Sequence, residues 1–303
     1  MDFKVENSIN QVVKVPSECG VELFIKREDE IHSFVSGNKY RKLKFNLLEA
    51  KISGHDTLLT FGGAYSNHIA AVAYAGKMYG FKTIGVIRGE ELKSKIEENE
   101  TLSFAKSNGM KFEFVTREVY REKGSQTLID HLKAFFGKFY LIPEGGTNEL
   151  AVKGCEEILT EEDKSFDVVC CPVGTGGTIS GLINGSGNTQ QILGFPALKG
   201  DFLRTEITKF VSKTNWDLIS DYHFGGYAKM NRDLIAFINT FKADNKIPLD
   251  PVYTGKMMFG VLDLIKTGFF KKGTRILAIH TGGLQGIQGM NSILKKKNIP
   301  IIS

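Results

Sequence analysis

The sequence predicts an α/β protein built from two open, mostly parallel α/β domains. Segments with strand character alternate with segments of helical periodicity along almost the whole chain, a pattern typical of parallel sheets whose strands are joined by helices. Three continuous apolar runs, at residues 167–173, 191–195 and 275–280, indicate strands that are buried on both faces. The 303 residues include 33 glycines and only 7 prolines, which favours many tight turns between short elements.

The expected elements fall into two series. In the first series, strands are expected at residues 21–26, 57–61, 83–87, 111–115 and 139–142, and helices at residues 40–53, 67–79, 100–107, 125–136 and 149–159. In the second series, which begins at Phe166, strands are expected at the three apolar runs and helices near residues 178–183, 204–211, 231–242 and 257–266. The double glycine at residues 145–146 lies near the predicted break between the domains. Ligands of such sheets bind at the carboxyl ends of the strands, so we expect the site in the loops there.

Charge and hydropathy exclude several classes of partner. The net charge is +5, and the basic clusters at residues 271–272 and 295–297 have no interleaved aromatic residues, so we expect no nucleic-acid partner. No run of 18 apolar residues occurs, so we expect no membrane span. The first residues lack the apolar segment of a signal peptide, and we therefore expect a cytoplasmic location.

Neither the cysteines nor the histidines have the spacing of a metal site. The four cysteines, Cys19, Cys155, Cys170 and Cys171, form no Cys-x-x-Cys motif, which argues against both a zinc site and a redox motif. The six histidines form no recognisable ligand spacing, so we expect no metal.

Lys39 is the first candidate for catalytic chemistry. It follows Gly37-Asn38, which permits a tight bend, and it precedes an apolar-periodic helix in which Leu43 and Leu47 repeat at i, i+4. A lysine at the positive end of a helix, and partly desolvated, has a lowered pKa and can act as a free amine in Schiff-base chemistry with an aldehyde cofactor. Alone, one lysine among 39 Lys and Arg is more consistent with a solvated surface residue. The assignment therefore depends on the loops that follow.

The turn at residues 174–178 predicts a phosphate-binding loop. Its sequence, Gly174-Thr175-Gly176-Gly177-Thr178, follows the apolar run at 167–173 and leads directly into a helix. Glycines let the backbone approach an anion, and the first amides of the helix point at it. A dinucleotide fingerprint would need a glycine in place of Ile179, and no P-loop Gly-Lys-[Ser/Thr] is present. Glycine-rich turns also occur without a ligand, and this alternative stays open.

Other strand-end loops carry polar side chains suited to a small substrate. The loop after residue 61 offers Ser66, Asn67 and His68 at a helix N-terminus, where either Ser66 or Asn67 could instead serve only as the helix cap. Two further loops, at residues 250–256 and 280–283, contain Tyr253 and His280, and we interpret His280 as a structural histidine.

These motifs together resemble one enzyme family. In chain order they read KRED, SGNKYRKL, FGGAYSNH, EGGTNELAVKG, PVGTGGT, DPVYTGK and HTGG. The set is similar to that of the 1-aminocyclopropane-1-carboxylate deaminase/D-cysteine desulfhydrase family, which are pyridoxal 5'-phosphate enzymes of the tryptophan-synthase β-like fold (fold type II). The resemblance runs from about residue 23 to residue 283.

The resemblance implies a cofactor, a domain division and roles for individual residues. Residues 41–143 would form a smaller inserted domain, residues 1–40 with 144–303 a larger domain that binds the cofactor, and the protein would be a homodimer. Lys39 would bind pyridoxal phosphate covalently, and Asn67 would contact the pyridine hydroxyl. The phosphate would be held by Gly174, Thr175, Gly176, Gly177 and Thr178. The substrate would be contacted by Ser66, Asn67 and His68, and Ser66, Tyr253 and Tyr227 would take part in catalysis.

Departures from the family pattern bear on the substrate. The family usually continues after HTGG with Ala-Pro-Ala-Leu, whereas this chain has Leu-Gln-Gly-Ile at residues 284–287, and the usual Gly-Tyr-Gly around Tyr227 is Gly-Tyr-Ala. In the deaminase branch, glutamate and leucine stand at the positions of Thr254 and Thr281. A glutamate beside the pyridine nitrogen would favour its protonation and so make the ring a deeper electron sink, whereas a threonine hydroxyl would not. We expect Thr254 and Thr281 among the cofactor-binding residues, although neither hydroxyl need reach the ring, since threonines are common at strand ends.

These observations lead to an expected reaction and its alternatives. We expect a lyase that acts on a small amino acid, with D-cysteine desulfhydrase-like β-elimination to pyruvate, ammonia and sulfide. One alternative is 1-aminocyclopropane-1-carboxylate deamination to 2-oxobutanoate and ammonia, and another is a non-catalytic homologue that binds the cofactor. A nucleotide-binding dehydrogenase is disfavoured by the missing fingerprint glycine.

Overall fold

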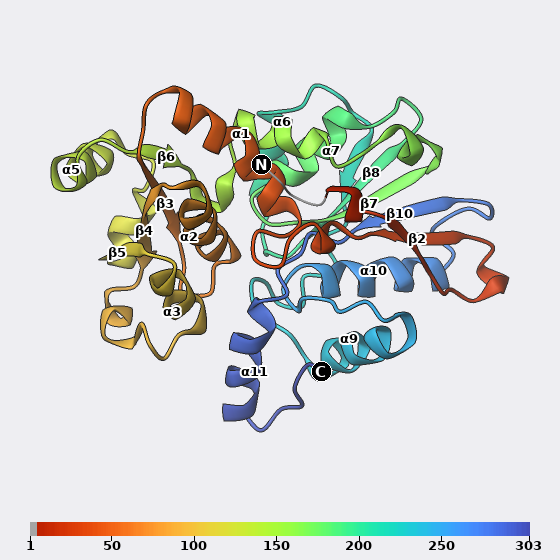
Figure 1. Cartoon of the computed structure of the whole chain (residues 1–303). Coiled ribbons are helices and arrows are strands. Elements are labelled where there is room, and N and C mark those ends of the chain that lie inside the picture. The colour runs from red at the N-terminus through yellow and green to blue at the C-terminus, as the bar shows by residue number, and fades with distance from the viewer. Residues whose placement is uncertain (1–4) are drawn as a thin grey trace.

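The computed structural model describes residues 5–303, which form two sheets that lie side by side with helices around both (Figure 1). The larger sheet has the strand order β1 (Asn10–Val13), β2 (Glu22–Lys26), β10 (Arg275–Ile279), β7 (Val168–Val173), β8 (Gln191–Pro196) and β9 (Trp216–Leu218). The smaller sheet has the order β5 (Met110–Val115), β4 (Lys82–Arg88), β3 (Thr57–Gly62) and β6 (Tyr140–Ile142). All neighbouring strands are parallel except β1 and β2.

The helices connect these strands in the alternating order that the sequence predicts. Those of the first half are α1 (Asn38–Ile52), α2 (Asn67–Tyr79), α3 (Glu100–Ser107), α4 (Arg117–Arg121), α5 (Gln126–Phe136) and α6 (Glu149–Glu156). Those of the second half are α7 (Gly177–Gly185), α8 (Phe202–Thr208), α9 (Arg232–Asn245), α10 (Thr254–Lys266) and α11 (Gly286–Lys296). The predicted α/β class with mostly parallel sheets is confirmed. The short elements β1, β9 and α4 and the helix α11 were not expected from the sequence.

The two ends of the chain meet in the larger sheet. Strand β2, near the N-terminus, pairs in parallel with β10, near the C-terminus, with Leu23 opposite Ile276. All four strands of the smaller sheet come from the chain between residues 57 and 142. We retain residues 41–143 as the proposed extent of the smaller domain.

Buried strands form the core of each sheet. Every residue of β7 and of β3 is buried, as the apolar run at 167–173 indicates for β7. Helices cover the faces, and their apolar side chains pack in separate clusters against the larger and the smaller sheet. In open α/β sheets, ligands bind among the loops that follow the carboxyl ends of the strands, so the candidate site is expected there.

Three helices approach one another closely enough that glycine is required at their contacts. A Cβ on Gly154 of α6 would lie 1.9 Å from the carbonyl oxygen of Arg41 on α1, and a Cβ on Gly181 of α7 would lie 2.4 Å from the Cβ of Cys155. This packing brings the N-terminus of α1, which carries Lys39, close to the N-terminus of α7, which follows the glycine-rich turn.

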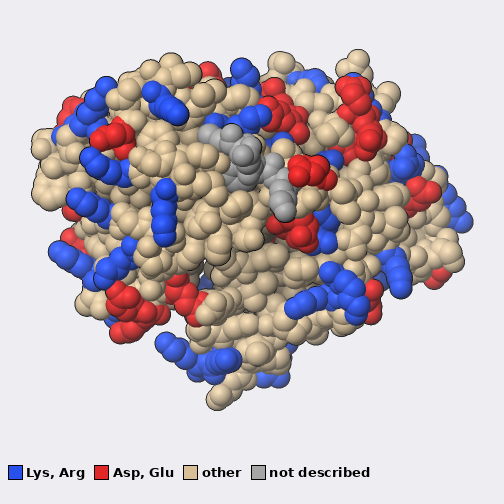
Figure 2. Space-filling model, in the orientation of Figure 1, with Lys and Arg blue, Asp and Glu red and all other residues tan. Residues whose placement is uncertain are grey.

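The surface carries charges of both signs. Figure 2 shows basic and acidic side chains interspersed over one face of the molecule. Within residues 5–303, none of the helices is both long enough and apolar enough to cross a membrane. Over the same residues, no three His, Cys, Asp or Glu side chains gather in the manner of a metal site.

The close contact of α6 with α1 gives a stability prediction. Gly154→Ala forces a methyl group against the backbone of α1, so we expect the free energy of unfolding to fall by about 1–3 kcal/mol. Gly289→Ala in α11 is the matched control, since a Cβ there meets the ring of Tyr65 at an ordinary 3.4 Å. Urea denaturation of both variants measures the difference, and equal stability of the two would contradict the close packing.

Candidate active site

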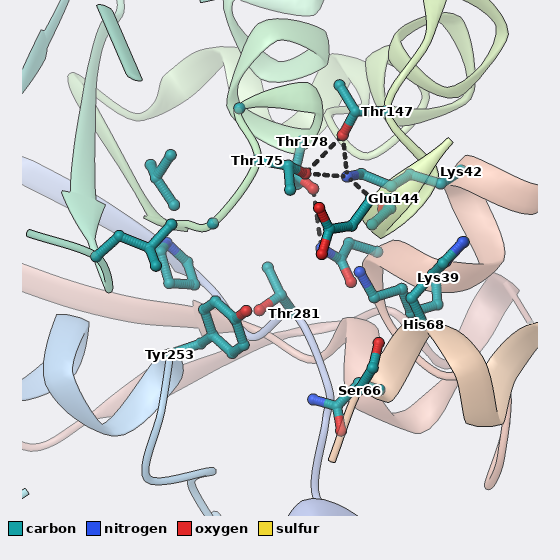
Figure 3. A pocket seen from close by; sticks show the side chains of 18 of the residues that line it. Lys39, Lys42, Ser66, His68, Glu144, Thr147, Thr175, Thr178, Tyr253 and Thr281 are labelled. Carbon is teal, nitrogen blue, oxygen red and sulfur yellow. Dashed lines mark hydrogen bonds between the residues drawn. The ribbon is translucent and has the colours of Figure 1, made fainter. Parts of the chain in front are cut away.

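A cavity of about 710 Å³ lies where the carboxyl ends of the two sheets face each other. Its walls include loops that follow β3, β6, β7 and β10, together with the N-terminus of α1, as Figure 3 shows for part of the lining. The structure brings together in this cavity most of the residues expected from the sequence: Lys39, Ser66, Asn67, His68, Gly174, Thr175, Gly176, Thr178, Tyr227, Tyr253 and Thr281. Gly177 and Thr254 are not among the lining residues.

Lys39 is held at the cavity by a turn that only glycine permits. Gly37 has φ 58°, and a Cβ on it would lie 2.2 Å from the carbonyl oxygen of Thr281. Helix α1 begins at Asn38, so Lys39 is in its first turn. Burial, assisted by the positive charge of Lys42, lowers the pKa of Lys39 to about 7 from an ordinary 10.5. A large fraction of this amine is therefore unprotonated at neutral pH.

Glu28 holds the same turn through hydrogen bonds. Its side chain is fully buried and accepts two hydrogen bonds from the guanidinium of Arg41, at 2.9 and 2.8 Å. Its backbone carbonyl accepts a hydrogen bond from the amide of Gly37 at 2.8 Å. Glu28 thus binds helix α1 through its carboxylate and the turn through its backbone carbonyl, and Lys39 lies between these two contacts. Removing Arg41 would leave the buried carboxylate of Glu28 without its cationic partner.

Lys42 marks one end of the cavity as a site for an anion. Its ammonium is buried and donates to the carbonyl of Gly145 at 3.0 Å and to the hydroxyls of Thr147 and Thr175 at 3.0 and 3.4 Å (Figure 3). Within residues 5–303, no carboxylate lies within 4.0 Å of it. A buried cation without a counter-charge is costly, and an anion bound beside it would remove that cost.

The glycine-rich turn completes this end of the cavity. Gly176 has φ 86° and caps α7, and a Cβ on Gly177 would lie 3.2 Å from the ammonium of Lys42. The hydroxyl of Thr178 accepts a hydrogen bond from the side chain of Asn38 at 2.9 Å. Amides of a helix N-terminus, hydroxyls and one buried ammonium together form the donor set that a phosphate group requires. The residues present therefore fit a phosphorylated cofactor.

The loop after β3 places one residue as a helix cap and two toward the cavity. The hydroxyl of Ser66 accepts a hydrogen bond from the amide of Ile69 at 3.4 Å, so Ser66 caps α2 as well as lining the cavity. Asn67 faces the loop after β10, where a Cβ on Gly283 would lie 2.6 Å from its amide nitrogen. The capping alternative that the sequence left open thus applies to Ser66, in addition to its place in the cavity.

His68 has a fixed tautomer. The hydroxyl of Thr60 donates to the carbonyl of Ile142 at 2.8 Å, so it must accept from the Nε2 of His68, which lies 2.8 Å away. The Nδ1 atom then carries a lone pair, and it is buried without a hydrogen-bond partner in the structure. Burial, with the positive charges of Lys39 and Lys42, lowers the pKa of His68 well below its ordinary value. His68 is therefore a neutral acceptor beside Lys39 (Figure 3).

Tyr253 is positioned by a buried carboxylate. Asp250 accepts hydrogen bonds from the amides of Val252, Tyr253 and Thr254 at 2.9, 3.0 and 2.8 Å, and from the Thr254 hydroxyl at 2.8 Å. The Thr254 hydroxyl thus bonds within the turn, and Thr254 is not among the lining residues of the cavity; its contact with a bound ring stays a prediction. Thr281 does line the cavity, and Figure 3 shows its side chain beside that of Tyr253.

A buried lysine holds the segment that carries Tyr227. Lys256 is 2% exposed, and its ammonium donates to the carbonyls of His223 and Gly226 at 2.9 and 2.8 Å. Burial lowers the pKa of Lys256 to about 8. The segment has positive φ at Phe224, Gly225, Gly226 and Ala228. These two hydrogen bonds stabilise a strained turn and so place Tyr227 with its ring centroid 6.2 Å from that of Tyr253.

The sequence analysis missed several residues of the site. Lys42 could have been found, because it lies three residues after Lys39 in a predicted helix and so shares its face. Lys256 gave no such signal, because the carbonyls that it binds are 30 or more residues away in the chain. The lining also includes Arg88, Lys123 and Glu144, which the motifs did not single out.

Comparison with known proteins identifies what the chain is similar to. Residues 8–282 match the family model described as pyridoxal-phosphate dependent enzyme. A putative 1-aminocyclopropane-1-carboxylate deaminase of Pyrococcus abyssi is 33% identical over 93% of this chain and 90% of its own length. A mitochondrial bifunctional D-cysteine desulfhydrase/1-aminocyclopropane-1-carboxylate deaminase of Arabidopsis thaliana is 30% identical over 88% of this chain and 74% of its own.

A solved structure agrees with these relatives. The crystal structure of an ACC deaminase homologue matches with a TM-score of 0.81 and 28% identity, and it covers 95% of this chain and 94% of its own. The likeness thus extends over both sheets and the cavity between them.

The environment of Lys39 gives a titration prediction. In the cofactor-free protein, the rate at which acetic anhydride acetylates Lys39 should reach half its maximum near pH 7. Peptide mass spectrometry measures this rate as a function of pH. In a Lys42→Gln variant the midpoint should rise, because the neighbouring positive charge that disfavours the Lys39 ammonium is gone. A midpoint near 10.5 in the wild-type protein would contradict the buried environment described here.

Proposed function

The chain belongs to the family of pyridoxal-phosphate dependent enzymes, and we propose that it is a lyase of the D-cysteine desulfhydrase type. Its fold is that of the tryptophan-synthase β-like (fold type II) members, and its relatives carry the names of lyases and deaminases. The proposed reaction is β-elimination from a small β-substituted amino acid, which gives pyruvate, ammonia and, from D-cysteine, sulfide. A homodimer in the cytoplasm is part of the same proposal.

The proposed orientation of the cofactor follows from the donor set. Lys42 and the turn at residues 174–178 would hold the phosphate, and the Lys39 amine would bind the aldehyde carbon. Asn67 would contact the pyridine hydroxyl, and Thr281 would lie near the pyridine nitrogen. When bound, pyridoxal phosphate supplies a covalent attachment for the substrate amine and a ring that accepts electrons from the α-carbon.

The side chains around the cavity provide the proton transfers and the binding of the substrate. With its pKa lowered to about 7, the Lys39 amine can accept the proton of the α-carbon at neutral pH. Burial raises the pKa of Tyr253 well above its ordinary value, so its hydroxyl stays protonated and can donate to the departing thiolate, a role that Tyr227 could share. The N-terminus of α2, with Ser66 and Asn67, would bind the substrate carboxylate, and the Nδ1 atom of His68 would accept a hydrogen bond from a donor group of the substrate.

One observation favours β-elimination over opening of a cyclopropane. Around Tyr253, the cavity presents the hydroxyls of Thr281 and Tyr227, and the carboxylates among its described lining residues are those of Glu144 and Glu206. The carboxylate of Asp250 is occupied by the backbone of its own turn. A ring nitrogen beside neutral hydroxyls is less readily protonated, which suffices where an α-proton and a good leaving group are present.

The other candidate functions are supported to different degrees. Deamination of 1-aminocyclopropane-1-carboxylate remains the second candidate, because both the archaeal and the plant relative bear that name. A non-catalytic homologue that only binds the cofactor is the third. The nucleotide-binding dehydrogenase is set aside, since the family match covers residues 8–282.

Removal of the Lys39 amine tests the assignment of the cofactor link. Lys39→Ala should reduce turnover to roughly one part in 10³ or less, because it removes both the covalent link and the base. Borohydride treatment of the wild-type protein should attach the cofactor to the peptide that contains Lys39. Lys51→Ala, at an exposed lysine in the last turn of the same helix, should keep both properties. Cofactor attached to another peptide would show that the assignment is wrong.

A substrate panel tests the reaction. We expect sulfide and pyruvate from D-cysteine or a related β-substituted amino acid, and little 2-oxobutanoate from 1-aminocyclopropane-1-carboxylate, because the hydroxyl of Thr281 would favour protonation of the ring nitrogen less than a carboxylate at that position. The panel should contain both enantiomers of each amino acid. Efficient deamination of the cyclopropane without sulfide release would reverse the order of the two candidates, and no product from any compound would favour the non-catalytic homologue.

A further inference from the structure

A second recess opens from the cavity at the carboxyl end of the smaller sheet. It has a volume of about 580 Å³ and shares with the main cavity the residues Gly63, Arg88, Lys123, Glu144 and Tyr227. Arg117, Arg121 and Tyr120 also line it. Because the five shared residues line both hollows, a ligand bound in the cavity can reach them.

Arg88 stands at the junction between the two hollows. It is the last residue of β4, and the parallel pairing of Gly62 with Ile87 places it beside the loop that follows β3. One terminal nitrogen of its guanidinium is 3.7 Å from the position that a Cβ on Gly63 would occupy. The positive charge of Arg88 therefore faces the loop that carries Ser66.

Two cations of this junction are paired with carboxylates, whereas Arg88 and Arg121 have no carboxylate within 4.0 Å among residues 5–303. Lys123 lies 3.3 Å from the carboxylate of Glu144, and Arg117 lies 3.1 Å from that of Glu91. Across residues 5–303, the structure has no carboxylate within 4.0 Å of Arg88. Its guanidinium carbon lies 5.7 Å from the centroid of the Tyr120 ring.

Arg88 is exposed, and its guanidinium lies over the ring of Tyr120. The Tyr120 ring is buried, and its hydroxyl donates to Glu144 at 2.6 Å. Glu144 also pairs with Lys123. The Tyr120 ring, over which the Arg88 guanidinium lies, is therefore positioned both by its burial and by this acceptor. A guanidinium over an aromatic ring keeps its planar set of donors available for an anion.

We propose that Arg88 forms a subsite for a negatively charged group on the side chain of the substrate. The inference rests on the proposed function, which places the phosphate at Lys42 and the substrate carboxylate at the N-terminus of α2. The cofactor phosphate and the substrate carboxylate do not use Arg88, so Arg88 is available to a third anionic group. A guanidinium binds a carboxylate, sulfonate or phosphate through two parallel hydrogen bonds. The preferred substrates are therefore amino acids whose β-substituent is anionic. In the reaction the α-proton goes to Lys39, and the Cβ–substituent bond breaks with its electron pair leaving on the substituent.

Two serine esters test this subsite with the holoenzyme. O-succinylserine and O-acetylserine share the same leaving chemistry, and only the first ends in a carboxylate; with one water, each gives pyruvate, ammonia and its free acid. We expect kcat/KM for pyruvate release to be higher for O-succinylserine. Arg88→Gln should lower that value roughly 10- to 100-fold, through KM, and leave O-acetylserine nearly unchanged. Arg88→Lys should fall between, since it keeps the charge but loses the paired donors.

Arg117→Gln is the matched control, because it removes an arginine of the recess that Glu91 already pairs. It should leave the preference between the esters unchanged. If Arg88→Gln lowers turnover of both esters equally, Arg88 acts on the site as a whole and the subsite is wrong. If phosphate ions instead change the turnover of O-acetylserine without raising its KM, the recess binds a free anion, and this too overturns the proposal.

A binding measurement separates this inference from the proposed reaction. Glutamate and glutamine have nearly the same shape, lack a β-leaving group and differ in side-chain charge. By calorimetry, one enantiomer of glutamate should bind the wild-type holoenzyme at least about 10-fold more tightly than the matching glutamine, and Arg88→Gln should abolish the difference. Equal binding of the two to the wild-type protein would refute the subsite even if both esters react. A charge preference without any elimination would keep the subsite and refute the reaction.

Discussion

The buried ammonium of Lys42 is the interaction on which the site depends. It contacts the turn after β6 through Gly145 and Thr147, and the turn after β7 through Thr175, so it joins the smaller and the larger sheet at the cavity. Backbone and hydroxyl oxygens solvate it only partly, and the absence of a nearby carboxylate in residues 5–303 leaves its charge to be balanced by a ligand. A phosphate group at this position satisfies both the lysine and the N-terminus of α7.

The same charge sets the chemistry one helical turn away. Lys42 contributes to lowering the pKa of Lys39 to about 7, and to keeping His68 neutral. Burial is the larger cause in both cases, and it follows from the close packing of α1, α6 and α7 at Gly154 and Gly181. Under the proposed function, helix packing, cofactor binding and catalysis share one physical origin, since the contacts that bury the lysines also lower the pKa of Lys39.

The sequence predicted the fold and much of the cavity, because these depend on local patterns. Helix α2 was expected at residues 67–79 and lies there, and the apolar run at 167–173 forms the buried strand β7. Contacts between distant segments could not be predicted. Strand β2 pairs with β10, which lies far away in the chain. Lys256 likewise donates hydrogen bonds to carbonyls of the distant segment that carries Tyr227. The hydrogen bond of the Thr254 hydroxyl to Asp250, four residues earlier in the same turn, was not expected from the sequence.

The central claim is that Lys42 and the glycine-rich turn hold the phosphate of the cofactor. The most direct test compares the dissociation constants of pyridoxal phosphate and of pyridoxal, which lacks the phosphate, for the cofactor-free wild-type protein and a Lys42→Met variant. The account predicts that the substitution weakens binding of pyridoxal phosphate by roughly 10- to 100-fold and leaves binding of pyridoxal nearly unchanged. Equal weakening of both compounds, or unchanged binding of pyridoxal phosphate, would contradict it.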